Sequence, residues 1–166
     1  MFVVKKTSIK LLKVAPFQET PGWCGPVSLK MVLAYYGLRK SERELARLAG
    51  ATRSQGVEAP ALEKVARRLG FAARIKDRAT LADIKKYLNK GIPVIVDWFS
   101  HDDGHYSVVV GLTKDTIYLQ DPEIGRIRTM DTKIFKRVWF DFPGDILRSK
   151  SAVILQRMLV VYPNKS

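Results

Sequence analysis

The sequence contains one cysteine, Cys24, and its surroundings favour a chemically active thiol. Gly25-Pro26 follows it, and Pro26 suits the first turn of a helix because its φ is fixed and its missing N–H is not needed there. Free N–H groups and the dipole at a helix N-terminus stabilise an anion. The preceding Thr20-Pro21-Gly22-Trp23 is typical of a turn, which leaves the sulfur accessible. The alternative is an inert, small hydrophobic side chain.

A thiolate that attacks a carbonyl needs donors for the developing oxyanion and a group that exchanges protons. Gln18 stands six positions before Cys24, and its side-chain amide together with the Cys24 backbone N–H would supply two donors. A surface glutamine in a loop is the alternative.

Two histidines are available as the general base. His105 opens an apolar strand and is preferred, because His101 lies in a polar loop that is expected to face solvent.

Asp121 is the predicted partner that orients the imidazole ring. It ends the strand after the one that His105 opens, and Lys114-Asp115 predicts a tight turn between the two strands. The hairpin would place residue 105 opposite about residue 124, so Asp121 reaches His105 if a β-bulge adjusts the register. The alternative for Asp121 is an ordinary Asp-Pro turn residue.

A metal site is the competing interpretation of the same region. His101, Asp102, Asp103 and His105 form a possible ligand cluster. Two histidines four residues apart suit one face of a helix, but Gly104 and the Asp pair indicate a loop. The sequence therefore predicts no metal and no organic cofactor.

The first half of the chain has the apolar spacing of helices. The expected helices run from Pro26 to Gly37, from a Ser41–Glu44 capping box to Ala49, from Val57 to Leu69, and from Thr80–Asp83 to about Asn89. The second half is richer in β-branched and aromatic runs. The expected strands are Pro93–Phe99, His105–Leu112, Thr116–Gln120, Ile127–Met130 and Ala152–Tyr162, with a short helix from Asp131 to about Val138.

Helices followed by antiparallel strands predict an α+β fold. A length of 166 residues suits one domain over 1–166, with a helical half over about 14–90 and a β half over about 91–166. No apolar run approaches the roughly 20 residues of a membrane span. Met1–Lys6 lacks the apolar region of a secretory signal, so the chain is expected in the cytoplasm.

The net charge is +13 and is unevenly distributed. Residues 1–80 carry 16 Lys/Arg against 6 Asp/Glu, a net charge of +10, whereas residues 81–166 carry only +3. A basic wall beside the site would prefer acidic peptides, although a solvated basic surface is the simpler explanation. Nucleic acid is not expected as a partner, because no basic strand rich in aromatic residues occurs. The Gly-Lys pair of a phosphate loop is also absent.

The motifs, taken as an ordered set, resemble one known family. They are Gln18-x5-Cys24-Gly25-Pro26-x-Ser28-Leu29, Met31-Val32-Leu33-Ala34-Tyr35-Tyr36-Gly37, Gly104-His105-Tyr106-x-Val108-Val109 and Asp121-Pro122-x-x-Gly125. The set is similar to the papain-clan cysteine peptidases that process bacteriocins, the double-glycine leader peptidases. The resemblance covers residues from about 14 to 145, which is nearly the whole chain.

The resemblance implies a papain-like cysteine peptidase acting on a peptide or protein substrate. It implies Cys24 as nucleophile, His105 as general base and acid, Asp121 as orienting group and Gln18 in the oxyanion hole. Trp23 and Gly104 flank these groups and are expected to contact substrate, with packing of Trp23 against the start of the helix as the alternative. Trp23 departs from the family, which usually has a small acidic or amide residue there. The family domains are commonly fused to ABC transporters, whereas this chain is expected to be a stand-alone member.

Two other activities fit the same residues. Relatives of the phytochelatin-synthase type, which the fold also resembles, transfer an acyl group to an amine or thiol instead of water. A binding module could retain the fold without turnover, although all four functional positions are intact here.

Overall fold

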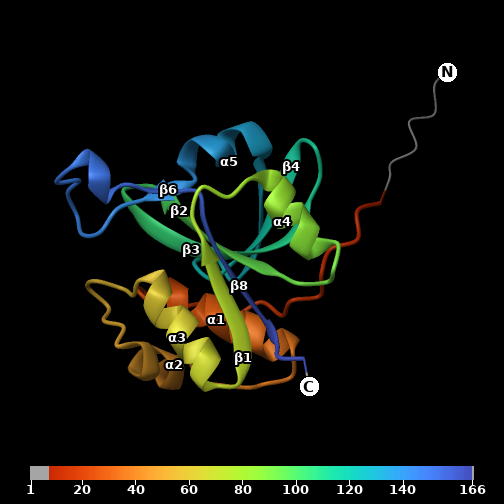
Figure 1. Ribbon diagram of the computed structural model, residues 1–166, viewed down its shortest axis with the longest axis horizontal. Helices are drawn as coiled ribbons and strands as arrows, with labels where there is room; N and C mark the ends of the chain where they lie inside the picture. Colours follow the sequence, from red (N-terminus) through yellow and green to blue (C-terminus); the bar gives the residue numbers. More distant parts are fainter. Residues whose placement is uncertain (1–7, 166) are drawn as a thin grey trace.

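The computed structural model describes residues 8–165, and a six-stranded antiparallel sheet runs through this part of the chain (Figure 1). The order of its strands is β1-β8-β2-β3-β4-β5. Their bounds are β1 Phe71–Lys76, β2 Val94–Ser100, β3 Asp103–Leu112, β4 Thr116–Asp121, β5 Arg126–Asp131 and β8 Arg157–Pro163. The α+β fold class expected from the sequence is confirmed. The N-terminal segment in which no secretory signal was found lies outside the described residues.

Helices cover both faces of this sheet. On one face lie α1 (Cys24–Tyr35), α2 (Glu42–Ala49) and α3 (Ala59–Arg68), and on the other lie α4 (Leu81–Leu88) and α5 (Thr132–Val138) (Figure 1). Each face has its own buried core. Leu29 and Leu62 pack with Val108 in the first core, whereas Ile84 and Phe135 pack with Val109 in the second. The side chains of neighbouring β3 residues therefore point to opposite faces of the sheet, as the alternation of a strand requires.

Local capping signals place most helix ends where the sequence predicts them. Ser41 Oγ accepts the Glu44 backbone N–H at 3.1 Å, and α2 ends at Gly50 with a left-handed φ of 67°. The Thr80–Asp83 capping box is complete, and Asp131 caps α5. At α2 only half of the expected box forms, because the Glu44 carboxylate pairs with Lys40 instead.

Two strands, β1 and β6, were not predicted from the sequence, and one expected strand is several elements in the structure. β1 lies inside the expected helical half and pairs with β8 from the other end of the chain. The expected strand Ala152–Tyr162 is divided into a short 3-10 helix (Lys150–Ala152), β7 (Ile154–Leu155) and β8. Gln156, which separates β7 from β8, has a φ of +43° that breaks the extended chain. β7 pairs with β6 (Phe140–Asp141) as a separate two-stranded sheet.

The hairpin of β3 and β4 has the register that the sequence suggested. Leu112 faces Ile117, and after an irregularity between Val109 and Gly111 the partner of Val108 is Gln120. The extra residue shifts the pairing by one position, as a β-bulge does. Asp121 is thereby placed on the same side of the ladder as His105. None of the helices among the described residues is long and apolar enough to cross a membrane.

Candidate active site

His105 and Asp121 are joined by a buried hydrogen bond. His105 Nε2 lies 2.7 Å from Asp121 Oδ1, and the two side chains are only 8% and 0% exposed. The Trp98 ring packs edge-on against the imidazole, with a centroid separation of 5.4 Å and an interplanar angle of 78°. Trp98 is held in turn by its Nε1–H, which donates to Ser107 Oγ at 3.0 Å. The imidazole is therefore fixed by one polar and one aromatic neighbour.

Cys24 is the first residue of α1, two positions before the proline that was expected to open the helix. The thiol is half-buried and close enough to His105 to raise the pKa of the imidazole. Gly25 keeps this approach close, because a Cβ there would lie 2.6 Å from Val57 Cγ1 and 3.3 Å from the Tyr106 ring. A side chain at position 25 would therefore crowd Val57 first, and Leu62 and the Tyr106 ring of β3 less closely.

The environment of His105 favours its protonated form. Burial by itself lowers the pKa of His105, but hydrogen bonds to Asp121 and Cys24, with their charges, outweigh it and raise the pKa to about 10. An imidazolium beside a thiol is the arrangement that stabilises a thiolate nucleophile. The structure thus brings Cys24, His105 and Asp121 together in that order.

Asp121 is held by two further groups besides His105. Arg128 Nε donates to its second oxygen, Oδ2, at 2.5 Å, and the Glu123 backbone N–H donates to Oδ1 at 3.0 Å. Burial raises the pKa of Asp121, but the hydrogen bonds from His105, Arg128 and Glu123 lower it overall. Asp121 therefore carries its negative charge at neutral pH.

The acidic groups around His105 could in principle hold a cation. Ligand atoms of His105, Asp121 and Glu123 lie within 4.8 Å of one another. Arg128, however, forms ion pairs with both carboxylates, at 2.5 Å to Asp121 and 3.0 Å to Glu123. A guanidinium already supplies the positive charge that a metal would bring. This group also differs from the cluster considered from the sequence, since His101 is exposed and turns at a φ of 55°.

Gln18 lies in the loop that leads to Cys24, and its side chain is exposed. Its Nε2 donates to the Glu123 carbonyl at 3.4 Å, which is the long end of the range for a hydrogen bond. The loop is tied to the site, because the Glu19 backbone N–H donates to the Pro122 carbonyl at 2.8 Å. It is also tied to α2, where Thr20 hydrogen-bonds the Glu42 carboxylate through both its backbone N–H and its hydroxyl.

The two predicted substrate contacts are placed differently. Trp23 is the N-cap of α1, and its half-buried indole lies 5.6 Å from the guanidinium carbon of Arg53. Gly104 directly precedes His105, and a Cβ there would collide with the Asp141 carboxylate. The need for glycine at position 104 thus has a packing explanation. A role in substrate binding stays a prediction for both residues.

A second buried acid lies next to this region. Asp97 on β2 is only 3% exposed, and its Oδ1 has no hydrogen-bond partner among the described residues. Burial and the Asp141 charge raise the pKa of Asp97 well above its usual value. Asp97 on β2 and Asp141 on β6 are therefore close enough to influence each other's ionisation.

Comparison with known proteins identifies the chain. The model of the Peptidase C39 family matches residues 15–142, which is most of the sequence. The chain belongs to the peptidase C39 family. It is accordingly a cysteine peptidase, and the papain-like fold expected from the motifs is confirmed.

Relatives of this C39 peptidase include both small and large proteins. An uncharacterised protein of Methanothermobacter thermautotrophicus is 33% identical over 128 residues, covering 75% of this chain and 79% of the relative. The transport/processing ATP-binding protein ComA of Streptococcus pneumoniae strain R6 is 34% identical over 119 residues, covering 70% of this chain. The match spans only 16% of ComA.

A solved structure shares the fold. The double-glycine motif protease from an AMS/PCAT transporter, crystallised in complex with its leader peptide, is similar with a TM-score of 0.66 and 23% identity. The similarity covers 97% of each chain. At this sequence identity, the similarity shows a shared fold and nothing further.

Several groups around His105 in this C39 peptidase were not identified from the sequence. Arg128, Glu123 and Trp98 were not predicted, and neither was Glu19, whose pKa is raised by burial while the His105 charge opposes the shift. Arg128 and Glu123 reach the site through the pairing of β5 with β4. Trp98 could have been found, since an aromatic residue in an expected strand next to the His105 strand is a natural packing partner.

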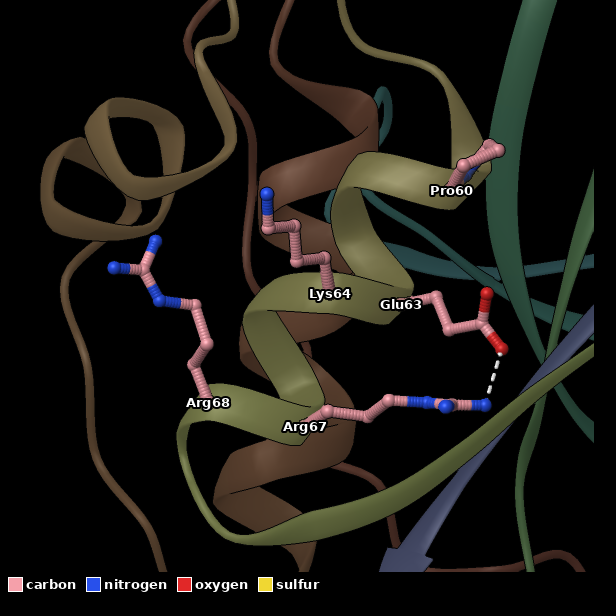
Figure 2. Close-up of a pocket in the computed structure, with 5 residues that line it drawn as sticks. All are labelled: Pro60, Glu63, Lys64, Arg67 and Arg68. Carbon is pink, nitrogen blue, oxygen red and sulfur yellow. Dashed lines mark hydrogen bonds and ion pairs between the residues drawn. The ribbon is translucent and has the colours of Figure 1, made fainter.

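A shallow cavity of about 430 Å³ lies on the outer surface of α3, lined by Pro60, Glu63, Lys64, Arg67 and Arg68 (Figure 2). Arg67 is bound within it, to Glu63 at 2.9 Å and to the Ala73 carbonyl at 2.8 Å. Figure 2 shows Lys64 and Arg68 extending on the other side of the helix, without that contact. None of the residues that line this cavity belongs to the site around His105.

Proposed function

We propose that this C39 peptidase hydrolyses a peptide bond through a Cys24–His105–Asp121 triad, with Gln18 and the Cys24 backbone N–H as oxyanion hole. The carrying observation is the buried 2.7 Å contact between His105 Nε2 and Asp121 Oδ1, with Cys24 against the same ring. Because Nε2 is bound to the carboxylate, Nδ1 is the ring nitrogen left to exchange a proton with Cys24.

The first half of the reaction forms a thioester. The Cys24 thiolate attacks the substrate carbonyl carbon, and the negative charge that develops on the oxygen is met by the two N–H donors. The protonated His105 then gives its proton to the amide nitrogen, the C–N bond breaks, and the amine leaves. The acyl group remains bonded to the Cys24 sulfur.

The second half releases the acid. Neutral His105 takes a proton from water as the oxygen attacks the thioester carbonyl, the C–S bond breaks, and the thiolate and imidazolium are restored. Asp121 stays ionised and keeps the ring oriented throughout. Gln18 can enter this scheme because its present contact with the Glu123 carbonyl is long and weak, so its amide can turn to an oxyanion.

The proposed substrate is a peptide segment with a pair of glycines before the scissile bond. The motif resemblance supports this, as does the relative that was crystallised with its leader peptide. Glycine at both positions would let the peptide backbone approach the site closely, because no side chain stands in the way.

Alkylation of Cys24 by iodoacetamide tests the triad without a known substrate. Wild-type protein and His105→Ala are compared at pH 6, with Cys24→Ala as the blank and mass spectrometry as the readout. We expect fast labelling of the wild type and a loss of at least tenfold in His105→Ala. Equal rates in both proteins would show that no activated thiol exists.

Peptides carrying Gly-Gly test the activity itself. Synthetic peptides with a central Gly-Gly and matched Ala-Ala controls are incubated with the protein, and the products are identified by mass. Cleavage after Gly-Gly that Cys24→Ala abolishes would support a peptidase. Products joined to an added amine would support acyl transfer. Fast alkylation without any product would favour a binding module.

A further inference from the structure

Arg128 on β5 bridges two carboxylates of the site. Its Nε donates to Asp121 Oδ2 at 2.5 Å, and its Nη2 donates to Glu123 Oε2 at 3.0 Å. The side chain is 27% exposed, and its guanidinium carbon lies 6.0 Å from the centre of the Trp98 ring. Trp98 is the same ring that packs against His105, so Arg128 and His105 share both an acidic and an aromatic neighbour.

The two oxygens of Asp121 are thus used by different partners. Oδ1 contacts His105 and accepts the Glu123 backbone N–H, whereas Oδ2 accepts from Arg128, and contacts at both oxygens fix the plane of the carboxylate. A carboxylate held at one oxygen alone can rotate about χ2, whose energy profile is broad. A planar guanidinium with donors at fixed angles removes this freedom better than a flexible ammonium does.

We propose that Arg128 is a positioning residue for the reaction: it acts through Asp121, holding the carboxylate in the orientation that directs His105 towards Cys24. The inference rests on the proposed triad. Arg128 contacts neither Cys24 nor His105 by a hydrogen bond in the described structure, so its effect passes through Asp121. Glu123, in the loop between β4 and β5, serves as the second anchor of the guanidinium.

Arg126 provides a matched control. It lies two residues before Arg128 on β5 and is the ladder partner of Asp121, but its side chain is exposed. Arg126→Ala therefore removes the same charge from the same strand without removing the bridge. Arg128→Lys keeps the charge but cannot reproduce the two fixed donors.

The test measures the second-order rate of Cys24 alkylation by iodoacetamide at pH 6.5, together with the melting temperature. We expect Arg128→Ala to lose roughly tenfold in rate, as a change in a supporting hydrogen bond often does. Arg128→Lys should lose severalfold, and Arg126→Ala should match the wild type. Adding methylguanidinium should restore at least part of the rate in Arg128→Ala only, because the partly exposed site can admit it.

Several outcomes would overturn the inference. A wild-type rate in Arg128→Ala or Arg128→Lys would do so. A loss in Arg128→Ala that methylguanidinium does not reverse, matched by an equal loss in Arg126→Ala, would also do so. If Arg128→Ala does not fold, the folded Arg128→Lys protein carries the test. If wild type and His105→Ala react equally, the triad itself fails, which is distinct from failure of the Arg128 role alone.

Discussion

In the proposed mechanism, the ionisation of His105 sets the pH range in which the site can act. Its pKa is raised to about 10, so the imidazolium persists at neutral pH and is lost only as the pH rises through that value. Replacing Asp121 by Asn removes one of the groups that raise the pKa. We expect the alkaline limb of the pH profile of kcat/KM for peptide cleavage, in which protonated His105 gives its proton to the leaving amine, to lie near pH 10 in the wild type and to move towards neutral in Asp121→Asn.

The measurement for this prediction is kcat/KM for cleavage of a Gly-Gly peptide between pH 5 and pH 10.5. Asp115→Asn, an exposed change in the β3–β4 turn, serves as the control and should leave the profile unchanged. Identical profiles for wild type and Asp121→Asn would contradict the role assigned to Asp121.

Gln18 offers a second residue-scale prediction. If its amide binds the oxyanion, Gln18→Ala should lower kcat for peptide cleavage by roughly 100-fold with little change in KM, because the contact forms chiefly in the transition state. Gln55→Ala, a change of another exposed glutamine, is the matched control. A change in KM alone would indicate that Gln18 binds substrate and does not stabilise the oxyanion.

Residue types and spacing predicted the central members of the site but not their supports. The Lys114-Asp115 turn indicated the register of β3 and β4, so Asp121 could be placed near His105. Arg128 gave no comparable signal, because one Arg in a basic chain has no distinctive spacing. Its contact depends on the side-chain path across β4 and β5, which local sequence patterns do not contain.

Among the elements, local signals were sufficient where a helix has a cap and insufficient where a strand depends on a distant partner. Thr80 and Asp83 determine the start of α4 through their own hydrogen bonds. β1 has weak alternation, Phe71-Ala72-Ala73-Arg74-Ile75-Lys76, and becomes a strand because β8 pairs with it. That partner is more than eighty residues away, so its influence is invisible to a local pattern.

The contact between β2 and β6 carries an element-scale prediction. Asp97 has a raised pKa, so the folded protein keeps a proton that the unfolded chain has released, and stability falls as the pH rises above about 4. Asp141, Arg157, Asp77 and Tyr106 are the ionisable groups around it. In Asp97→Asn the side chain at this position does not titrate, so the variant avoids this loss of stability at higher pH.

We therefore expect Asp97→Asn to melt about 2–5 °C above the wild type at pH 8 and at nearly the same temperature at pH 4. Thermal unfolding followed by circular dichroism at both values gives the comparison. Asp145→Asn, an exposed acid between β6 and β7, should show no such change with pH. A difference that is largest at pH 4 would reverse the assigned sign.

At the scale of the whole molecule, the site forms where the layer of α1, α2 and α3 packs against the sheet. Cys24 belongs to the layer of α1, α2 and α3, whereas His105 and Asp121 lie on adjacent strands of the sheet (Figure 1). The order of helices and strands predicted this α+β arrangement. It could not predict that β1 crosses from the helical segment into the sheet, which ties the two halves together through β8.

The uneven charge of the molecule leads to the last prediction. The net charge of +10 on residues 1–80 includes Lys64 and Arg68, which extend from the outer surface of α3 (Figure 2). A basic half should attract acidic peptides over a distance of about 10 Å at 0.1 M salt, and less at higher salt. We expect kcat/KM to be larger for an acidic than for a matched basic Gly-Gly peptide, with the ratio approaching one in 0.5 M NaCl.

The location of the effect is tested by two double variants with the same loss of charge. Lys64→Ala/Arg68→Ala changes the α3 surface, whereas Lys85→Ala/Lys86→Ala changes exposed residues of α4 on the other face of the sheet. The first should reduce the preference for acidic peptides and the second should preserve it. Equal kcat/KM for both peptides at 20 mM salt would mean that the basic half is a solvated surface. Equal effects of the two double variants would assign the preference to net charge and not to the α3 surface.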